Sequence, residues 1–550
     1  MQVTRRVFTA GALSAAASFR FASPAFGQGT PKFDGAIAAI SAHAEQHLRY
    51  FGLPGMTLGL TTPSGFNTVL NFGFANRDSQ ARITPDTLFQ IGSISKSMTA
   101  NVIHQLAAEG RLRLTDRVGA LLPTLHLPAS ITVQHLLDHT AGLPDDAPLF
   151  PDGGLLTAYA PGAHWHYSNT GYHILGEIAA KVGGKPLDRL LTERIFAPLG
   201  MRRSRGAIIG PDRALYAQGY EMADMTAPFV RGVPLAPAAW VDVTFGAGCV
   251  ASTADDMLRW MRSLADAAQG RGGLGLGPAQ AKAFTSHFVA TDSPALTYGN
   301  GFMHVGGEGK PFLHHTGGMV SFASSFHVDT QTGIGAFASS NITAFAEYRP
   351  RLLTMYAVGA LAAAAAGRSV PPPPALAATL SNAADFVGRY RGPAGAFEVK
   401  AGSPLTIVAN GQEAALQWSG DNFFRTLHPD FHAFTLQFEG KAPAINGASC
   451  GSNSYVREGS GATLPRTDRE LEPFVGRYIN DSPWWGMIRV VERAGKLWLG
   501  TETPTTRVAP NLWRIGDESW SPERMSFADY IGGRPQTLIF SGEKFVRHDI

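Results

Sequence analysis

The chain has 550 residues, of which 44% are hydrophobic and 16% charged, and its formal net charge is +3. That length exceeds what one hydrophobic core usually serves, so two or three domains are expected. The 62 glycines and 36 prolines indicate many turns and much antiparallel sheet, which excludes long helical repeats.

Residues 1–27 are typical of an export signal. Arg5 and Arg6 precede a mild apolar stretch that is too short to span a bilayer, and small residues around Ala25 suit cleavage. The pattern predicts a twin-arginine signal and a periplasmic or secreted protein with no integral membrane span. The signal holds three arginines and no acid, so basic and acidic residues balance in the rest of the chain. Nucleic acid and anionic membrane surfaces are therefore not expected partners.

Helix and strand patterns mix in the first two thirds of the chain. Apolar residues recur every four positions from Ser93 to Glu109, which predicts an amphipathic helix, and a second helix is predicted from about Thr170 to Lys181. Residues 312–318, 322–328 and 334–340 read as strands, the last two joined by a turn. The combination predicts helices packed on an antiparallel sheet.

A proline run and an internal repeat organise the rest of the chain. Pro371–Pro374 cannot continue a helix or a central strand, so they form a spacer. The string "DFVGRY" at Asp385–Tyr390 returns as "PFVGRY" at Pro473–Tyr478, 88 residues later. Each repeat is long enough for a small barrel or sandwich of short strands. The predicted division is a first domain at 30–368, a linker rich in proline and alanine at 369–380, and β units at 381–468 and 469–550.

Ser93 and Lys96 are the first candidate catalytic pair. They lie one helical turn apart, so the lysine can reach the serine hydroxyl. Unpaired backbone N–H groups at the helix start favour negative charge that develops there, and apolar surroundings would lower the pKa of the lysine and let it act as a base. Ser541 and Lys544 share the spacing, but they fall in a strand-end turn that we interpret as a solvated loop.

A serine hydroxyl is a poor nucleophile near neutrality, so a second group should carry its proton to the leaving group. Tyr167 is the candidate for that role. Asn169, at the start of the next predicted helix, can hold the lysine and a substrate carbonyl through its amide. The same Tyr-x-Asn spacing begins at Tyr298 and Tyr478, which we interpret as turn residues.

The third element is "HHTGG" at His314–Gly318, in a predicted edge strand. A strand that ends in glycines lets substrate backbone approach closely. The N–H groups of Gly318 and Ser93 are expected to form an oxyanion hole, where loss of one donor typically costs about 3 kcal/mol. His315 is expected to project toward the substrate, and a purely structural histidine is the alternative.

Ser93-x-x-Lys96, Tyr167-x-Asn169 and His315-Thr316-Gly317, in this order, resemble the three motifs of the penicillin-recognising serine hydrolases. That family includes class C β-lactamases, D-alanyl-D-alanine carboxypeptidases, D-aminopeptidases and related esterases. The strings "HLLDHTAGLP" and "STADDM" also agree with it, and the resemblance covers roughly residues 33 to 365.

The resemblance implies an α+β fold: a β-lactamase/transpeptidase-like catalytic domain, with an antiparallel sheet flanked by helices, followed by two small antiparallel β-barrel domains. It also implies an acyl-enzyme mechanism with Ser93 as nucleophile, assisted by Lys96 and Tyr167. The residues that it assigns to substrate binding are Asn169, His315, Thr316, Gly317 and Gly318.

His315 departs from the family's β-lactamases, which commonly carry lysine at that position. Imidazole is only partly charged near pH 7, which disfavours efficient β-lactam hydrolysis. Histidine at this position is more similar to the D-aminopeptidase and esterase branches. D-Aminopeptidases of this family also carry two β-barrel domains after the catalytic one. Trp484 and Trp485, in a predicted loop of the second β unit, either cover a substrate pocket or pack the barrel, and packing is the commoner role.

The sequence therefore predicts a hydrolase of small amide, peptide or ester substrates. The alternatives are a β-lactamase, or a penicillin-binding or sensing protein with slow turnover. No cofactor and no catalytic metal are expected, because His135 and His139 lack a third ligand at a known zinc spacing. Cys249 and Cys450 fall in different predicted domains, which excludes a disulfide scaffold. The expected partner is a small-molecule or short peptide substrate, and homo-oligomerisation stays open.

Overall fold

The structure is a computed structural model that describes residues 32–149, 155–224, 226–305, 312–343, 346, 348–376 and 380–548. The predicted export signal at residues 1–27 lies outside the described residues. Among the helices in the described ranges, none is long and apolar enough to cross a membrane.

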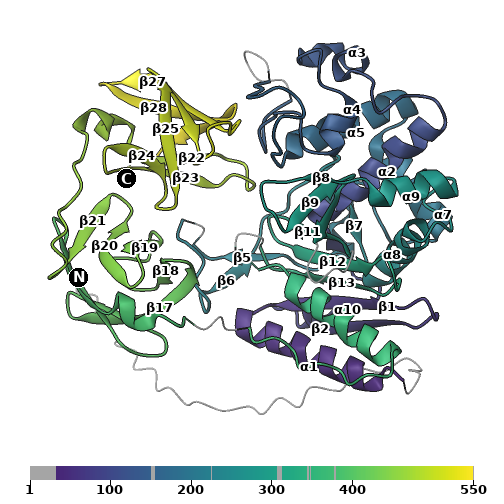
Figure 1. Cartoon of the computed structure of the whole chain (residues 1–550), viewed down its shortest axis with the longest axis horizontal. Coiled ribbons are helices and arrows are strands. Elements are labelled where there is room, and N and C mark those ends of the chain that lie inside the picture. The colour runs from purple at the N-terminus through teal and green to yellow at the C-terminus, as the bar shows by residue number, and fades with distance from the viewer. Residues whose placement is uncertain are drawn as a thin grey trace, which may run out of the picture.

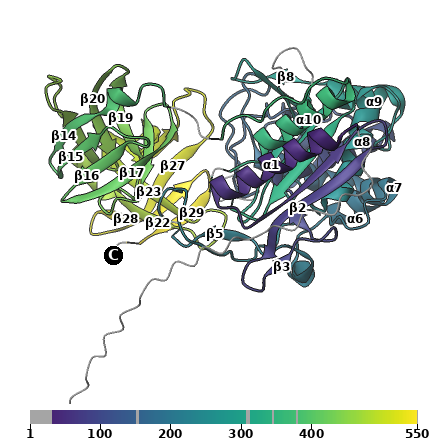
Figure 2. The same cartoon turned by 90° about the horizontal axis from the view of Figure 1, so that it is seen from below.

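A nine-stranded antiparallel sheet forms the centre of the first domain, as far as the chain is described. Helices α1 and α10 pack on one face, against β2, β12 and β13, and α8 packs on the other, against β1 and β13. Figures 1 and 2 show α1 and α10 lying side by side across the sheet. The predicted helices on an antiparallel sheet are confirmed. In spatial order, the strands are β3 (Ala81–Arg82), β2 (Asn67–Asn76), β1 (Gly55–Thr61), β13 (Gly335–Ser340), β12 (Ala323–Asp329), β11 (Phe312–Gly318), β10 (Phe302–Val305), β9 (Leu296–Gly299) and β8 (Val289–Ala290).

Both predicted helices of the first domain are present. The first is α2, which follows a 3₁₀ turn at Gly92–Ile94, and the second is α5, which ends at Gly184 with a φ of +71°. Glycine reaches this left-handed conformation without strain, so it is a common helix stop. The helices are α1 (Asp34–Phe51), α2 (Ser95–Ala108), α3 (Val118–Leu121), α4 (Val133–Leu137), α5 (Asn169–Gly183), α6 (Leu187–Leu191), α7 (Ala197–Leu199), α8 (Ala254–Ala268), α9 (Pro278–Ser286) and α10 (Arg351–Ala365). Short strands β4 (Phe89–Gln90) and β7 (Ala251–Ser252) pair with each other, as do β5 (Tyr220–Met222) and β6 (Leu235–Pro237).

The prediction that β11 is an edge strand is wrong. Strand β12 pairs with it along its whole length, and β10 pairs with Phe312–His314 on the other side. The reason is that residues 289–305 fold into β8, β9 and β10 and extend the sheet beyond β11. Over the described residues, His315–Gly318 has a ladder with β12 alone. In this half of the strand, Gly317 and Gly318 pack against the turn that carries Ser93.

The internal repeat corresponds to two closed antiparallel barrels, which confirms the predicted β-barrel architecture. Tyr390 donates a hydrogen bond from its hydroxyl to the carbonyl of Phe386 at 2.8 Å, and Tyr478 donates one to Phe474 at 2.9 Å. Each repeat thus uses its "FVGRY" tyrosine to anchor the start of its barrel. The exact domain boundaries given above stay a prediction. The first barrel holds β14 (Gly388–Gly392), β15 (Gly395–Lys400), β16 (Thr406–Ala409), β17 (Gln412–Gly420), β18 (Phe423–Thr426), β19 (Leu436–Lys441), β20 (Ala444–Cys450) and β21 (Asn453–Arg457).

The second barrel faces the first domain on the side of the candidate site. Figure 1 shows both barrels on one side of the molecule, with the second, in yellow, extending toward the first domain. Its strands are β22 (Gly476–Ile479), β23 (Met487–Arg493), β24 (Lys496–Leu499), β25 (Thr503–Ala509), β26 (Leu512–Ile515), β27 (Arg524–Ile531), β28 (Arg534–Phe540) and β29 (Glu543–Arg547).

Candidate active site

Ser93 lies in the 3₁₀ turn that leads into α2, and this turn is held on both sides. The N–H of Ile91 donates to the carbonyl of Val250 at 3.1 Å, and the hydroxyl oxygen of Ser95 accepts a hydrogen bond from the N–H of Val250 at 3.0 Å. These contacts fasten the start of α2 to the segment just before β7. They therefore fix the backbone of the turn that carries the hydroxyl of Ser93.

Two glycines let β11 pack directly against this turn. A Cβ atom on Gly317 would lie 1.9 Å from the carbonyl oxygen of Ile91, and one on Gly92 would lie 2.8 Å from the carbonyl oxygen of Gly318. Gly92 also has a φ of +53°, which favours glycine. The glycines of the third motif thus have a structural use, close contact between β11 and the Ser93 turn, besides the substrate approach that the sequence predicts.

Lys96 makes the contacts expected of a base beside a nucleophile. Its Nζ is 3.0 Å from the Oγ of Ser93, 2.5 Å from the Oδ1 of Asn169 and 3.1 Å from the carbonyl oxygen of Ala247. Burial lowers the pKa of Lys96 from 10.5 to about 7, even though the nearby carboxylates of Asp145 and Asp146 act in the opposite direction. A neutral amine near pH 7 can accept the hydroxyl proton.

Asn169 is held in one orientation by two aspartates that the sequence analysis did not single out. Its Nδ2 donates to the Oδ1 of Asp145 at 3.0 Å and to the Oδ2 of Asp146 at 3.1 Å. Since carboxylates accept hydrogen bonds, the amide nitrogen must face them, and the amide oxygen then faces Lys96. Burial raises the pKa of both aspartates.

Tyr167 places its ring over the ammonium of Lys96, with the Nζ 4.8 Å from the ring centroid. The side chain is half-buried. Burial raises the pKa of its phenol, although a hydrogen bond with Ser93 acts in the opposite direction. The phenol therefore stays protonated near neutrality, so it is suited to donate a proton and Lys96 to accept one.

His315 is a buried neutral residue with 1% of its surface exposed. Its Nδ1 is 2.6 Å from the carbonyl oxygen of Thr316, so Nδ1 carries the proton, and Nε2 accepts a hydrogen bond from the hydroxyl of Tyr298 at 3.2 Å. Burial, together with Lys96, lowers the pKa of His315 to about 3. Tyr298 itself lies in β9 and Tyr478 lies in β22, so the interpretation of both as turn residues is wrong.

The cavity beside Ser93 has a volume of about 280 Å³ and is closed partly by the second barrel. Of the predicted site residues, Ser93, Asn169 and Gly318 line it. Lys96 and Tyr167 contact Ser93, whereas His315, Thr316 and Gly317 belong to the strand behind that contact. The lining residues are Ser93, Asp146, Ala147, Pro148, Leu149, Asn169, His173, Phe245, Ala247, Gly248, Gly318, Met319, Trp484, Trp485 and Glu543.

The two tryptophans of the second barrel lie in this lining. Trp484 packs against an apolar cluster of the first domain that includes Met319. Trp485 contacts the rings of Phe540 and Phe545 in its own barrel, at centroid distances of 6.0 and 5.9 Å. The pair therefore combines the two roles weighed from the sequence, since it packs the barrel and also borders the cavity.

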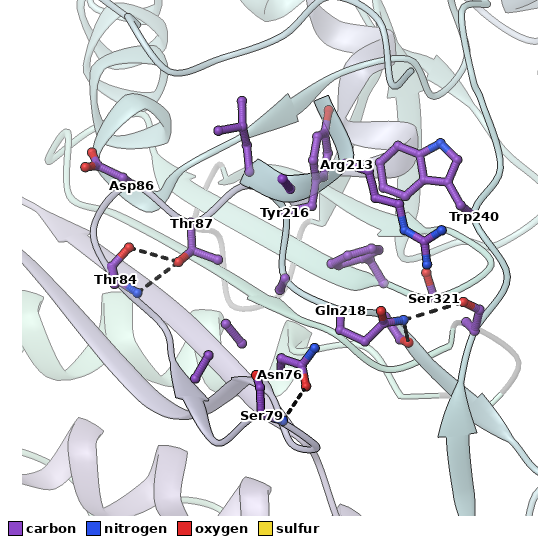
Figure 3. Close-up of a pocket in the computed structure, with 18 of the residues that line it drawn as sticks. Asn76, Ser79, Thr84, Asp86, Thr87, Arg213, Tyr216, Gln218, Trp240 and Ser321 are labelled. Carbon is purple, nitrogen blue, oxygen red and sulfur yellow. Dashed lines mark hydrogen bonds between the residues drawn. The ribbon is translucent and has the colours of Figure 1, made fainter. Parts of the chain in front are cut away.

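A larger cavity of about 820 Å³ lies elsewhere in the first domain, between the β2–β3 hairpin and residues 210–240. Figure 3 shows Arg213 and Trp240 at one end of it and Asn76 and Ser79 at the other. Among the described residues, it shares no lining residue with the cavity beside Ser93. It therefore does not form part of the candidate active site.

A serine in contact with a lysine of lowered pKa and beside a protonated tyrosine, in a helix-flanked antiparallel sheet, is the arrangement expected of the penicillin-recognising serine hydrolases. The Beta-lactamase family model matches residues 28–361, which is more than half of the chain. The chain belongs to the β-lactamase family.

Individual relatives agree with this assignment. A β-lactamase of Pseudomonas fluorescens is 35% identical over 165 residues, covering 28% of this chain and 46% of the relative. A β-lactamase of Lysobacter lactamgenus is 31% identical over 245 residues, covering 42% of this chain and 60% of the relative. The chain thus spans about half the length of the curated relatives it matches.

Solved structures share the fold. The octameric penicillin-binding protein homologue from Pyrococcus abyssi superposes with a TM-score of 0.55 at 20% identity, covering 76% of this chain and all of that one. At this identity, the likeness concerns the fold alone.

Proposed function

We propose that this protein is an exported serine hydrolase that forms an acyl-enzyme at Ser93 and cleaves small amides, peptides or esters that carry a free amino group. The observation that carries the proposal is the 3.0 Å contact between the Oγ of Ser93 and the Nζ of Lys96, beside a cavity in which the ionisable groups other than a histidine are carboxylates.

The proposed acylation step uses three groups. The Oγ of Ser93 attacks the carbonyl carbon while Lys96 takes its proton, and the N–H groups of Ser93 and Gly318 stabilise the oxyanion. As the C–N or C–O bond breaks, Tyr167 donates its proton to the leaving group and regains one from Lys96. Water then attacks the acyl-enzyme by the reverse sequence, which releases the acid and restores the hydroxyl of Ser93.

The charges that line the cavity support a substrate with an ammonium group. Asp146 and Glu543 contribute carboxyl groups, and among the described residues that line the cavity there is no lysine or arginine. Burial lowers the pKa of His173, also in the lining, to about 3, so this imidazole supplies no positive charge. A carboxylate on the substrate would meet like charges here, which is unfavourable, whereas an ammonium would be attracted.

Desolvation raises the pKa of Asp146 and of Glu543, and their mutual repulsion adds to the effect on Glu543. A bound ammonium between them favours their ionised forms. The substrate amine therefore offsets the repulsion between the two carboxylates. The charges of the cavity therefore favour amino-acid amides and short peptides with a free N-terminus.

β-Lactam hydrolysis is the second candidate function, and the names of the two relatives above favour it. The neutral His315 argues against it. The family's β-lactamases commonly have a permanent cation at this position for the substrate carboxylate, and here the imidazole is buried and its pKa lies well below neutrality.

The test compares alanine amide, N-acetyl-alanine amide, a short-chain nitrophenyl ester and a chromogenic cephalosporin on the purified protein and on the Ser93→Ala variant. We expect turnover of the free amide, weaker turnover of the acetylated amide, and loss of both in Ser93→Ala. Glu543→Gln should narrow the difference between the two amides. Fast cephalosporin turnover with neither amide hydrolysed would contradict the substrate assignment.

Export is supported by the twin arginines of the sequence, which lie outside the described residues. Replacing Arg5 and Arg6 with lysine should leave the protein in the cytoplasm, as measured by cell fractionation. The same fractionation of the unmodified chain is the control, and equal export of both would contradict the signal assignment.

A further inference from the structure

Glu523 of the second barrel contacts the segments that carry the candidate catalytic residues. It lies just before β27, and its side chain is 13% exposed. Its Oε1 accepts a hydrogen bond from the backbone N–H of Asp145 at 2.6 Å and lies 3.0 Å from the Nε2 of His166. Its Oε2 accepts a hydrogen bond from the hydroxyl of Ser541 at 2.5 Å. One carboxylate thus joins the barrel to two separate loops of the first domain.

The loop that carries Asp145 connects to the proposed nucleophile. Asp145 accepts a hydrogen bond from the Nδ2 of Asn169 at 3.0 Å, and the Oδ1 of Asn169 is 2.5 Å from the Nζ of Lys96. Lys96 in turn contacts Ser93 at 3.0 Å. Four hydrogen bonds, with the covalent structure of Asp145 between the first and the second, therefore connect Glu523 to the hydroxyl of Ser93.

The second loop ends at the candidate proton donor. His166 immediately precedes Tyr167, and its backbone N–H donates to the carbonyl of His139 at 2.9 Å. The ring of His139 lies 4.5 Å from the ring of Tyr167, centroid to centroid. By holding the imidazole of His166, Glu523 fixes the backbone from which Tyr167 projects.

Glu523 carries its negative charge in this position. Burial raises the pKa of the carboxyl, but the hydrogen bonds from His166, Ser541 and Asp145 outweigh burial and hold the pKa below its usual value. Hydrogen bonds to an ionised acceptor are shorter and about twice as strong as those between neutral groups. The contacts of Glu523 are therefore strong enough to define the geometry of the loops that they join.

We propose that Glu523 is a positioning residue for the catalytic centre, and that docking of the second barrel through this carboxylate aligns Asn169, Lys96 and Tyr167 on Ser93. The proposal rests on the function proposed above, with Ser93 as the nucleophile. It assigns the second barrel a part in the chemical step that is separate from the contact its tryptophans make with the cavity.

The experiment measures the second-order rate at which a small fluorophosphonate labels Ser93 in the full-length chain. The Oγ of Ser93 forms a bond to phosphorus, fluoride leaves, and the hydroxyl proton passes to the enzyme base. Because the probe is small, the rate reports activation of the hydroxyl and depends little on the contacts of a larger substrate. Kinetics with the amide substrate then separate kcat from KM.

Three variants of Glu523 separate the parts of the proposal. Glu523→Ala removes every contact and should slow labelling by about 10²-fold, which is the typical loss when a reacting group is misplaced by about 1 Å. Glu523→Asp keeps the charge but draws the carboxylate away from Asp145, so it should also slow labelling. Glu523→Gln keeps an oxygen for the N–H of Asp145 and should restore much of the rate. In Glu523→Ala and Glu523→Asp, the fold-change in kcat should be larger than the fold-change in KM.

Two controls distinguish positioning from barrel stability. Ser541→Ala removes only the contact within the barrel, so it should change the rate much less than Glu523→Ala. Glu518→Ala changes an exposed glutamate five residues earlier and should leave the rate unchanged. Thermal unfolding of each variant shows whether the chain is folded.

The outcomes are distinct. Labelling of Glu523→Ala and Glu523→Asp at the rate of the unmodified chain would overturn the proposal, as would equal losses in Glu523→Ala and Ser541→Ala. If Glu523→Ala does not fold, Glu523→Asp decides. Labelling that persists in Ser93→Ala would instead overturn the proposed function, and the role of Glu523 with it.

Discussion

Gly317→Ala tests whether the packing of β11 against the Ser93 turn sets the geometry of the nucleophile. A Cβ at this position would lie 1.9 Å from the carbonyl oxygen of Ile91 and 2.4 Å from the Oγ of Ser324. Ser324 is also held in place, because its Oγ donates a hydrogen bond to the same carbonyl of Ile91 at 3.0 Å. The new methyl group therefore has no flexible neighbour that can move aside.

The size of the effect follows from the distances. Atoms of this kind do not approach within 3.0 Å, so β11 and the turn must separate by about 1 Å. Overpacking of this kind typically costs about 1–3 kcal/mol of stability. Because Ser93 is two residues after Ile91, the same displacement should slow acylation by about 10²-fold.

The assay is the rate of fluorophosphonate labelling, measured beside the free energy of unfolding in denaturant. Gly359→Ala is the matched control. A Cβ at Gly359, on the exposed face of α10, would meet nothing within 4 Å, and alanine in a helix interior stabilises by about 1 kcal/mol relative to glycine. If Gly317→Ala leaves both the labelling rate and the free energy of unfolding unchanged, the packing of β11 against the turn does not set the position of Ser93.

Three further predictions concern single side chains. The labelling rate of Ser93 should rise as the pH increases through about 7. The pKa of Lys96 is about 7, so below this pH its amine is protonated and cannot accept the hydroxyl proton. A rate that does not change with pH across this region would contradict the role of the lysine. Tyr167→Phe keeps the ring but removes the phenol proton, so kcat for the amide should fall by about 10²-fold or more while the thermal midpoint stays close to that of the unmodified chain; full activity would exclude it as the proton donor. Asp256→Ala should lower the free energy of unfolding by about 3 kcal/mol, because the buried carboxylate accepts hydrogen bonds from the backbone N–H groups of Arg203 and Ser204 at 2.8 Å each, and these groups would lose their partner; a denaturant midpoint equal to that of the unmodified chain would show that other groups replace it.

Local patterns in the sequence predicted several helices and strands, the repeated β units and one contact of the candidate site. The apolar spacing after Ser93 predicted α2, and the strings at 312–318, 322–328 and 334–340 predicted three strands, because these signals depend on neighbours within one helical turn or one strand. The repeated "FVGRY" string predicted two similar β units, and in the structure its tyrosine anchors the start of each barrel. The contact between Ser93 and Lys96 also followed from sequence, because residues three apart on a helix share a face.

Other features were decided only by the tertiary structure. The interior position of β11 depends on β8, β9 and β10, whose short strands carry weak signals of their own. The charge state of His315 depends on its burial beneath Tyr298 and beside Lys96, which the motif does not contain. A pattern of residue types shows which group stands at a position, and the surrounding packing sets its pKa.

The contacts between the second barrel and the first domain could not be predicted from local sequence patterns. Trp484 and Trp485 were visible in the sequence as a loop with two possible uses, and Glu523 carried no signal at all. The contact between Glu523 and Asp145 joins residues 378 positions apart, and no local periodicity encodes such a pair. The sequence by itself predicted the contact between Ser93 and Lys96 and the repeated β units, because those are properties of residues close together in the chain. Only folding brought a barrel carboxylate and two tryptophans to the same serine, because that meeting depends on how separately formed surfaces pack together.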